Sequence, residues 1–224
     1  YQATNKNTHK RVALKVLNAS LSSDESLITD LQRSVVVSSS LEHANIAKVY
    51  DLGEDLSYHF IASEFIDGVA LQTLIEHYKK FDIDHACRIM QEAAKGLSFA
   101  HKQGIFHGCL HPGNIIIEKQ TGRVVITDFG TSRALFTHNS ELKNDTKRLG
   151  FIAPELSSDS APDSQSDLFS LGAALYYMVT GERPAPGLVS TPGAALPQMP
   201  RLRAHLPKAP IWLETLVARL MVSD

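Results

Sequence analysis

The chain has 224 residues, 43% hydrophobic and 21% charged, a composition typical of a globular protein with ample core-forming side chains. A formal net charge of −2 gives no electrostatic argument for nucleic acid or an anionic membrane, and no apolar run reaches the roughly 18–20 residues of a membrane-spanning helix. The two cysteines, Cys87 and Cys109, offer no disulfide framework, which favours a reducing compartment such as the cytoplasm.

The first part of the sequence predicts strands around one helix. Residues 1–4 and 11–17 flank a polar turn, which indicates a β-hairpin. Residues 24–41 carry apolar side chains at helical spacing, but their valine- and serine-rich end forms helices poorly, so we expect a weakly formed helix. Two further strands are expected at residues 47–52 and 59–64.

The rest of the sequence predicts mostly helices. A short helix is expected near residues 71–75 and a strong amphipathic helix over residues 84–103. A hydrophobic helix follows at residues 166–180, and another at residues 211–221. Residues 184–200 are rich in proline, serine and glycine and predict a loop.

Six short motifs follow one another along the chain. They are Val12-Ala13-Leu14-Lys15, His43-Ala44-Asn45-Ile46, the loop His107–Asn114, Asp128-Phe129-Gly130, Ala153-Pro154-Glu155 and Ser166–Gly172. In this order they resemble the bacterial Ser/Thr protein kinases, and the resemblance covers essentially the whole chain. It implies one α+β, two-lobed kinase-like domain. Residues 1–66 would form a small antiparallel β lobe with one helix and the hinge, and residues 67–224 a mainly helical lobe.

The family has parts that this sequence does not contain. A glycine-rich loop over the phosphates would precede Tyr1, and a last helix would follow Asp224. The family's arginine partner of Glu155 belongs to that last part. We therefore expect the chain to be a fragment of the kinase-like domain, truncated at both ends.

The resemblance implies a site for ATP and Mg²⁺ between the lobes. Lys15 takes the position of the lysine that contacts the α- and β-phosphates, and Asn114 and Asp128 take those of the two magnesium ligands. Ala13 and Ile116 are placed to sandwich the adenine. Four further nucleotide positions are implied: the gatekeeper Ser63, the hinge carbonyl of Glu64, the hinge amide of Ile66, and His111 facing the phosphates.

The catalytic side departs from the family pattern at five positions. Cys109 replaces the aspartate that accepts the proton of the substrate hydroxyl, and Gly108 replaces the arginine that senses activation-loop phosphorylation. Arg148 replaces the threonine beside that base. Ser34 stands where the family has the glutamate partner of the lysine, and Ser38 where an apolar residue stacks on the phenylalanine of Asp-Phe-Gly. These last two changes weaken the link that closes an active kinase.

Lys15 therefore needs another partner. A partly buried ammonium without one costs on the order of several kcal/mol. Asp30 lies one turn before Ser34 on the expected weak helix, whereas Asp128 lies at a fixed turn. We predict that Lys15 pairs with Asp128 when no nucleotide is bound, and not with the helix.

The central loop also raises two other hypotheses, a cysteine acting as a base and a pair of histidines binding a metal. A thiol with an ordinary pKa of about 8.5 is mostly protonated at neutral pH, so we interpret Cys109 as a small apolar filler rather than a base. His107 and His111 are four residues apart, but they lie in a loop with Pro112 and without the helix and glutamate of a zinc protease. By resemblance, His107 instead packs under the Asp-Phe-Gly turn.

These observations favour a pseudokinase: a kinase-like domain that binds ATP and Mg²⁺ weakly and acts as a regulatory or scaffolding module for a protein partner. A slow but active Ser/Thr protein kinase is one alternative. A purely structural interaction domain without nucleotide is the other. We expect no nucleic-acid partner, no membrane segment in this chain and a cytoplasmic location.

Overall fold

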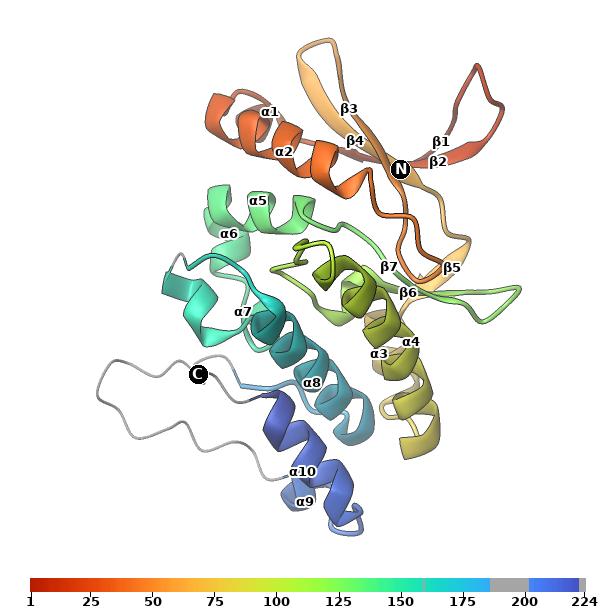
Figure 1. Cartoon of the computed structure of the whole chain (residues 1–224), viewed down its shortest axis with the longest axis vertical. Coiled ribbons are helices and arrows are strands. Elements are labelled where there is room, and N and C mark those ends of the chain that lie inside the picture. Colours follow the sequence, from red (N-terminus) through yellow and green to blue (C-terminus); the bar gives the residue numbers. More distant parts are fainter. Residues whose placement is uncertain (159, 186–201, 222–224) are drawn as a thin grey trace.

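A sheet-containing lobe lies above a helical lobe, and the two are stacked along the long axis of the molecule (Figure 1). The computed structural model describes residues 1–158, 160–185 and 202–221, so most of the loop predicted at residues 184–200 lies outside the described residues. No helix within these ranges has both the length and the apolar character needed to cross a bilayer. The predicted two-lobed fold, with an antiparallel β lobe and a helical lobe, is confirmed.

The first lobe is built on a four-stranded antiparallel sheet with the strand order β1-β2-β4-β3. Its strands are β1 (Gln2–Thr4), β2 (Arg11–Val16), β3 (Val49–Asp55) and β4 (Tyr58–Glu64). The predicted hairpin and the two later strands are therefore present. The register of β2 on β4 pairs Ala13 with Ser63, which brings two predicted adenine-site residues side by side.

Helix α2 (Glu25–Ser38) covers this sheet, preceded by the short helix α1 (Ala19–Ser22). The Asp24 carboxylate caps α2 by accepting a hydrogen bond from the Leu27 backbone N–H at 3.0 Å. One face of α2 is buried and consists of Leu27, Leu31, Val35 and Ser38. The expectation of a weakly formed helix was wrong, because the cap and the burial outweigh the low helix propensity of its valines and serines.

A helix from a distant part of the sequence completes the core of the first lobe. Helix α5 (Thr131–His138) begins directly after Gly130 and lies beneath α2, as Figure 1 shows. Its Ala134 and Leu135 side chains are buried in the same apolar cluster as those of α2 and the sheet. The sequence analysis assigned no helix to this segment. The start of the activation segment is therefore packed into the first lobe.

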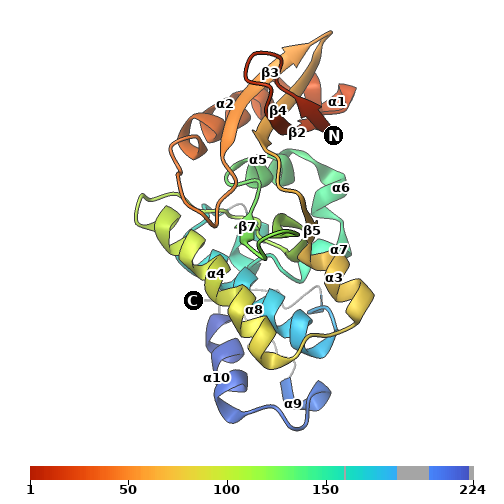
Figure 2. The ribbon, with the colours of Figure 1, turned by 90° about the vertical axis from the view of Figure 1, so that its right-hand side faces the viewer.

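The second lobe surrounds the buried helix α8 (Ser164–Thr180), against which α4 (Ile83–His101) and α10 (Ile211–Leu220) pack (Figure 2). These three helices and α3 (Leu71–Tyr78) confirm the four helices predicted here. A three-stranded antiparallel sheet lies at the top of this lobe: β5 (Gly68–Ala70), β6 (Ile115–Glu118) and β7 (Val124–Ile126). The remaining elements are one or two turns long: η1 (Pro112–Asn114), α6 (Ser140–Lys143), α7 (Thr146–Leu149), η2 (Pro154–Ser158) and α9 (Leu202–His205).

Candidate functional site

A cavity of about 640 Å³ opens between the two lobes, and we call it the interlobe cavity. It is lined by Tyr1, Gln2, Ala13, Leu14, Lys15, Val16, Ser63, Glu64, Phe65, Ile66, Ile116, Thr127 and Asp128. The structure thus brings together every nucleotide-binding residue implied by the sequence except His111. These residues come from the β1–β2 hairpin, the end of β4 with the segment that follows it, strand β6 and the Asp128 turn.

Lys15 forms an ion pair with Asp128, as predicted: its Nζ lies 2.5 Å from Asp128 Oδ2. The same oxygen accepts a hydrogen bond from Asn114 Nδ2 at 3.0 Å. Burial is the largest single effect and would raise the pKa of Asp128, but the charge and hydrogen bond of Lys15 lead the opposing effects, and that pKa lies below its ordinary value. The carboxylate is therefore ionised at neutral pH and engaged by two donors.

Helix α2 contributes no ion pair to Lys15 along its described length. Asp30 instead lies 2.9 Å from Nε2 of His138 on α5, whose Nδ1 lies 3.3 Å from Asp24. Ser34 faces the Asp-Phe-Gly turn, since a Cβ built on Gly130 would lie 3.4 Å from the Ser34 Cβ. The position of the missing glutamate is thus close to the turn but holds no acid.

Ser38, which was predicted to weaken the link between α2 and the Asp-Phe-Gly turn, still contacts that turn. Its side chain is buried, and its hydroxyl donates a hydrogen bond to the backbone carbonyl of Phe129 at 2.9 Å. A polar contact has replaced the expected apolar stacking. The Phe129 ring packs on His107 instead, with ring centroids 5.0 Å apart.

The central loop is fixed by the fully buried Asp167 of α8. Its carboxylate accepts backbone hydrogen bonds from His107 and Gly108, each at 2.8 Å, and lies 2.8 Å from His101 Nε2. Gly108 adopts φ +69°, and a Cβ there would lie 2.8 Å from Pro162, so this turn requires glycine. The loop keeps the frame of a catalytic loop without the arginine of the family.

Both ring nitrogens of His107 make hydrogen bonds that hold the central loop. Its Nε2 donates to the Thr127 carbonyl at 3.0 Å, and its Nδ1 accepts from the Cys109 backbone N–H at 3.3 Å. Both ring nitrogens are engaged, so His107 has none left for a metal. Burial is the main cause that lowers the pKa of His107, and the ring is neutral.

Cys109, which the resemblance places at the position of the catalytic base, is a buried thiol with 1% of its surface exposed. Burial raises its pKa to about 11, against the opposing charges of Arg148 and Arg133. At neutral pH the sulfur is therefore protonated and can accept no proton from a substrate hydroxyl. This geometry agrees with an apolar filler.

A second cavity of about 490 Å³ adjoins the first and shares Lys15, Val16 and Asp128 with it. The other predicted phosphate residue, His111, lines this second cavity together with Asn114 and Arg148. Two buried polar atoms of the wall, His111 Nε2 and Asn114 Oδ1, have no hydrogen-bond partner among the described residues.

The donor set fits a magnesium ion at the Asn114 and Asp128 positions. Asn114 Oδ1 is a buried acceptor that receives no hydrogen bond from any residue the structure describes, and Mg²⁺ prefers carboxylate and amide oxygens. Asp128 is less well prepared, because Lys15 and Asn114 already bind its Oδ2. A metal would have to compete with the Lys15 ion pair.

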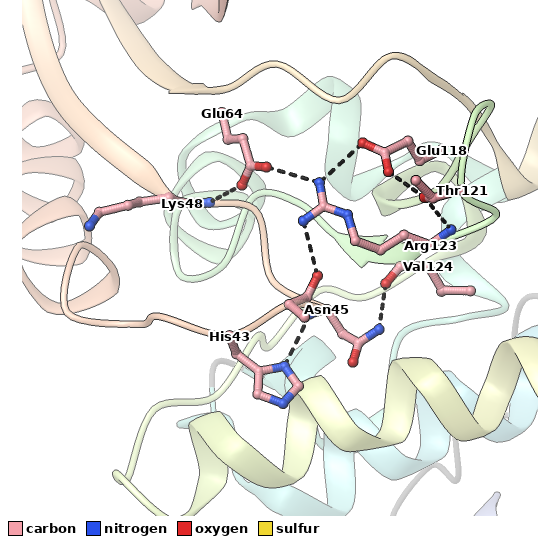
Figure 3. A network of polar contacts seen from close by, with 9 residues as sticks. His43, Asn45, Lys48, Glu64, Glu118, Thr121, Arg123 and Val124 are labelled. Carbon is pink, nitrogen blue, oxygen red and sulfur yellow. Dashed lines mark hydrogen bonds and ion pairs between the residues drawn. The ribbon is translucent and has the colours of Figure 1, made fainter.

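Glu64 has a role that its sequence pattern does not predict. Its carboxylate is 2.9 Å from Arg123 Nη2 and accepts a hydrogen bond from the Lys48 backbone N–H at 3.2 Å (Figure 3). Arg123 also reaches Glu118 at 3.3 Å and the Ala44 carbonyl at 3.3 Å. The hinge is thereby connected to the β6–β7 hairpin of the second lobe. Arg123 belongs to none of the sequence motifs. Its role becomes visible only in the structure, where it contacts Glu64 and Ala44 from distant parts of the sequence.

Taken together, the two lobes, the cavity between them and the braced loop define the fold of a protein kinase domain. The chain belongs to the protein kinase domain family, which its residues 1–201 match. It is 32% identical over 186 residues to the serine/threonine-protein kinase PknB of Mycobacterium tuberculosis, covering 80% of this chain and 30% of that protein. It is 29% identical over 207 residues to PrkC of Bacillus subtilis, covering 91% of this chain and 31% of that protein.

The solved structures support the fold. The kinase domain of Mycobacterium tuberculosis PknI superposes with a TM-score of 0.77 at 24% identity, over 100% of this chain and 82% of that one. The chain spans less than a third of the length of PknB and PrkC.

Proposed function

We propose that this chain is a catalytically impaired kinase-like domain that binds ATP and acts as a regulatory or scaffolding module. The observation that carries the proposal is the contrast between the two halves of the site. In the binding half, Lys15, Asn114 and Asp128 form one connected cluster on the wall of the cavities. In the catalytic half, the base position holds the buried Cys109 thiol with a pKa of about 11.

In this proposal the adenine lies in the interlobe cavity between Ala13 and Ile116, and the hinge backbone of Glu64 and Ile66 supplies its polar contacts. The phosphates then point toward Lys15. Mg²⁺ held by Asn114 and Asp128 would supply charge neutralisation for the phosphates. The open volume of the interlobe cavity supports this proposal over a domain whose pocket is filled by side chains.

An acceptor hydroxyl would meet no ionised base. General-base assistance contributes about 10²–10⁴-fold to such a reaction. Cys109 is protonated, and Asp128 lies in the ion pair with Lys15. Phosphoryl transfer would therefore be slower than in an intact kinase by at least the missing general-base contribution.

The test measures binding and transfer separately. We expect Mg-ATP to raise the melting temperature of the protein and Lys15→Met to abolish most of that shift. We also expect no phosphorylation of generic protein substrates above the background of Lys15→Met and Asp128→Ala. Phosphorylation that is lost in both variants would replace this proposal by a slow Ser/Thr kinase. A complete lack of nucleotide binding would replace it by a structural interaction domain.

We also propose a protein partner and a reducing, cytoplasmic environment. Cys87 and Cys109 are both free thiols, which supports such an environment. A domain that binds nucleotide without turnover needs another protein to respond to its state.

A further inference from the structure

The described lining of the second cavity contains more basic than acidic side chains. Among the lining residues that the structure describes, Lys15 and Arg148 are the basic side chains and Asp128 is the single acid. The described lining residues therefore carry a net positive charge, because the acid that pairs with Arg148, Asp145, is not among them. A nucleotide with its base in the interlobe cavity would extend its phosphates past the shared residue Lys15 into this wall.

Arg148 forms an ion pair with a residue three positions earlier in the chain. Its Nε lies 3.3 Å from Asp145, which does not line the cavity, and its side chain remains 36% exposed. Such a partly exposed pair is weak. The two Nη groups make no hydrogen bond to the described residues, and a planar guanidinium fork suits a phosphoryl group.

His111 supplies a second donor to the same wall. Its Nδ1 accepts a hydrogen bond from the Gly113 backbone N–H at 3.0 Å, which places the ring proton on Nε2. This Nε2–H group is buried and has no acceptor in the part of the chain that the structure describes, and the residue is only 5% exposed. A buried donor without an acceptor costs free energy, which a phosphate oxygen would recover.

The local backbone keeps the His111 ring in place. A Cβ built on Gly113 would lie 2.6 Å from Cε1 of that ring, so only glycine leaves it room. Burial first, and then the nearby charge of Arg148, lower the pKa of His111 to about 3. The ring therefore keeps one proton at neutral pH, and Arg148 lies near enough to act on it.

We propose that Arg148 and His111 form a phosphoryl-binding site that takes the terminal phosphate of ATP without a divalent metal. This inference rests on the proposed nucleotide binding. A magnesium ion must compete with Lys15 for Asp128, whereas Arg148 and His111 can bind an anion while that ion pair stays intact. ATP affinity should therefore depend little on magnesium and strongly on Arg148.

The test is calorimetric titration of the full chain with ATP and with adenosine, each in EDTA and in excess Mg²⁺. We expect wild-type protein to bind ATP in EDTA and more tightly than adenosine. Arg148→Gln should weaken ATP binding in EDTA by about 10- to 100-fold, the value of a charge-assisted hydrogen bond, and leave adenosine binding unchanged. Arg148→Lys should retain part of the affinity. Arg88→Gln, which removes an exposed arginine of α4 that lines neither cavity, is the matched control.

The outcomes separate this inference from the proposed function. Equal ATP binding by wild type and Arg148→Gln in EDTA, or wild-type binding that requires Mg²⁺, would overturn the inference while adenosine binding still supports the nucleotide site. Loss of both ATP and adenosine binding in wild type would overturn both. Should Arg148→Gln fail to fold, competition by inorganic tripolyphosphate in EDTA decides: it should displace ATP and not adenosine, and a failure to displace ATP would overturn the inference.

Discussion

His111 is a buried neutral ring near the charges of Arg148, Asp128 and Lys15, and this position makes the stability of the protein sensitive to acid. Its pKa of about 3 in the folded protein lies below the ordinary value of 6.5, mainly because the ring is buried. Between these pH values the unfolded chain binds a proton that the folded protein does not. The stabilisation is therefore complete above pH 6.5 and is lost progressively as the pH falls toward 3.

We predict that His111→Gln flattens this dependence. Below pH 6.5, the free energy of unfolding of the variant should fall less steeply with decreasing pH than that of wild type. The two slopes should differ by about 1.4 kcal/mol per pH unit, the value for one proton. Urea denaturation at a series of pH values measures the difference. Substitution of the exposed His9 by glutamine should leave the wild-type profile unchanged. Parallel profiles of wild type and His111→Gln would contradict the prediction.

The two thiols should differ in reactivity. Cys109 is 1% exposed with a pKa of about 11, so at pH 8 about one molecule in a thousand carries the thiolate that alkylating agents need. Cys87 is only partly buried, although burial also raises its pKa. We predict that iodoacetamide modifies native Cys109→Ser faster than native Cys87→Ser, and that urea removes the difference. Rapid labelling of native Cys87→Ser, measured by mass spectrometry, would contradict the buried position of Cys109.

At the scale of single residues, a contact could be predicted from sequence where a residue lacks the partner that it has in the family. Serine at position 34 left Lys15 without a glutamate, and Asp128 was the acid at a fixed turn, so their ion pair could be predicted. The contacts of Ser38 and Arg123 could not be predicted from sequence. Each contact joins segments that are far apart along the chain, and only the packing of the fold brings them together. The pairing of His138 with the acids of α2 falls in the same group.

At the scale of elements, α5 determines how the activation segment relates to the first lobe. Leu135 is buried with Leu31 and Val35 of α2 in one apolar cluster. His138 adds polar contacts to Asp24 and Asp30 at the end of the helix. Helix α2 is therefore held on both sides, by the sheet and by α5.

We predict that Leu135→Ala destabilises the protein by about 2–5 kcal/mol, the usual cost of truncating a buried leucine. Amide hydrogen exchange should accelerate in α5 and in α2, because each buries the other. Leu56→Ala is the matched control: Leu56 is 86% exposed, so its truncation should cost within about 0.5 kcal/mol. An equal effect of the two substitutions would show that α5 does not stabilise the first lobe.

The elements found from sequence are those with a long or regular apolar pattern. Helices α4 and α8 and strand β4 have one, and their positions were predicted closely. Helices α5, α6 and α7 are one or two turns long, and a pattern of that length does not separate a helix from a loop. Helix α2 was expected to be weak because propensity was weighed without its burial against α5.

At the scale of the whole molecule, several connections fix the lobes around the candidate site. Helix α5 joins the activation segment to the first lobe, and Arg123 joins the hinge residue Glu64 to the β6–β7 hairpin (Figure 3). The Lys15–Asp128 ion pair spans the same gap from strand β2 to the floor of the cavity. This ion pair engages the carboxylate that a metal would use.

Restoring the missing acid should release that carboxylate. Ser34 faces the Asp-Phe-Gly turn, so Ser34→Glu places a second carboxylate where the family pairs a glutamate with the lysine. Lys15 can then leave Asp128, whose oxygens become available to Mg²⁺. We predict that Mg-ATP binds Ser34→Glu more tightly than wild type, and that EDTA removes this gain. Ser26→Glu, which adds the same charge at an exposed position of α2, should not change the affinity. Unchanged or weaker Mg-ATP binding by Ser34→Glu in calorimetric titration would show that the Lys15–Asp128 ion pair does not limit the use of the metal.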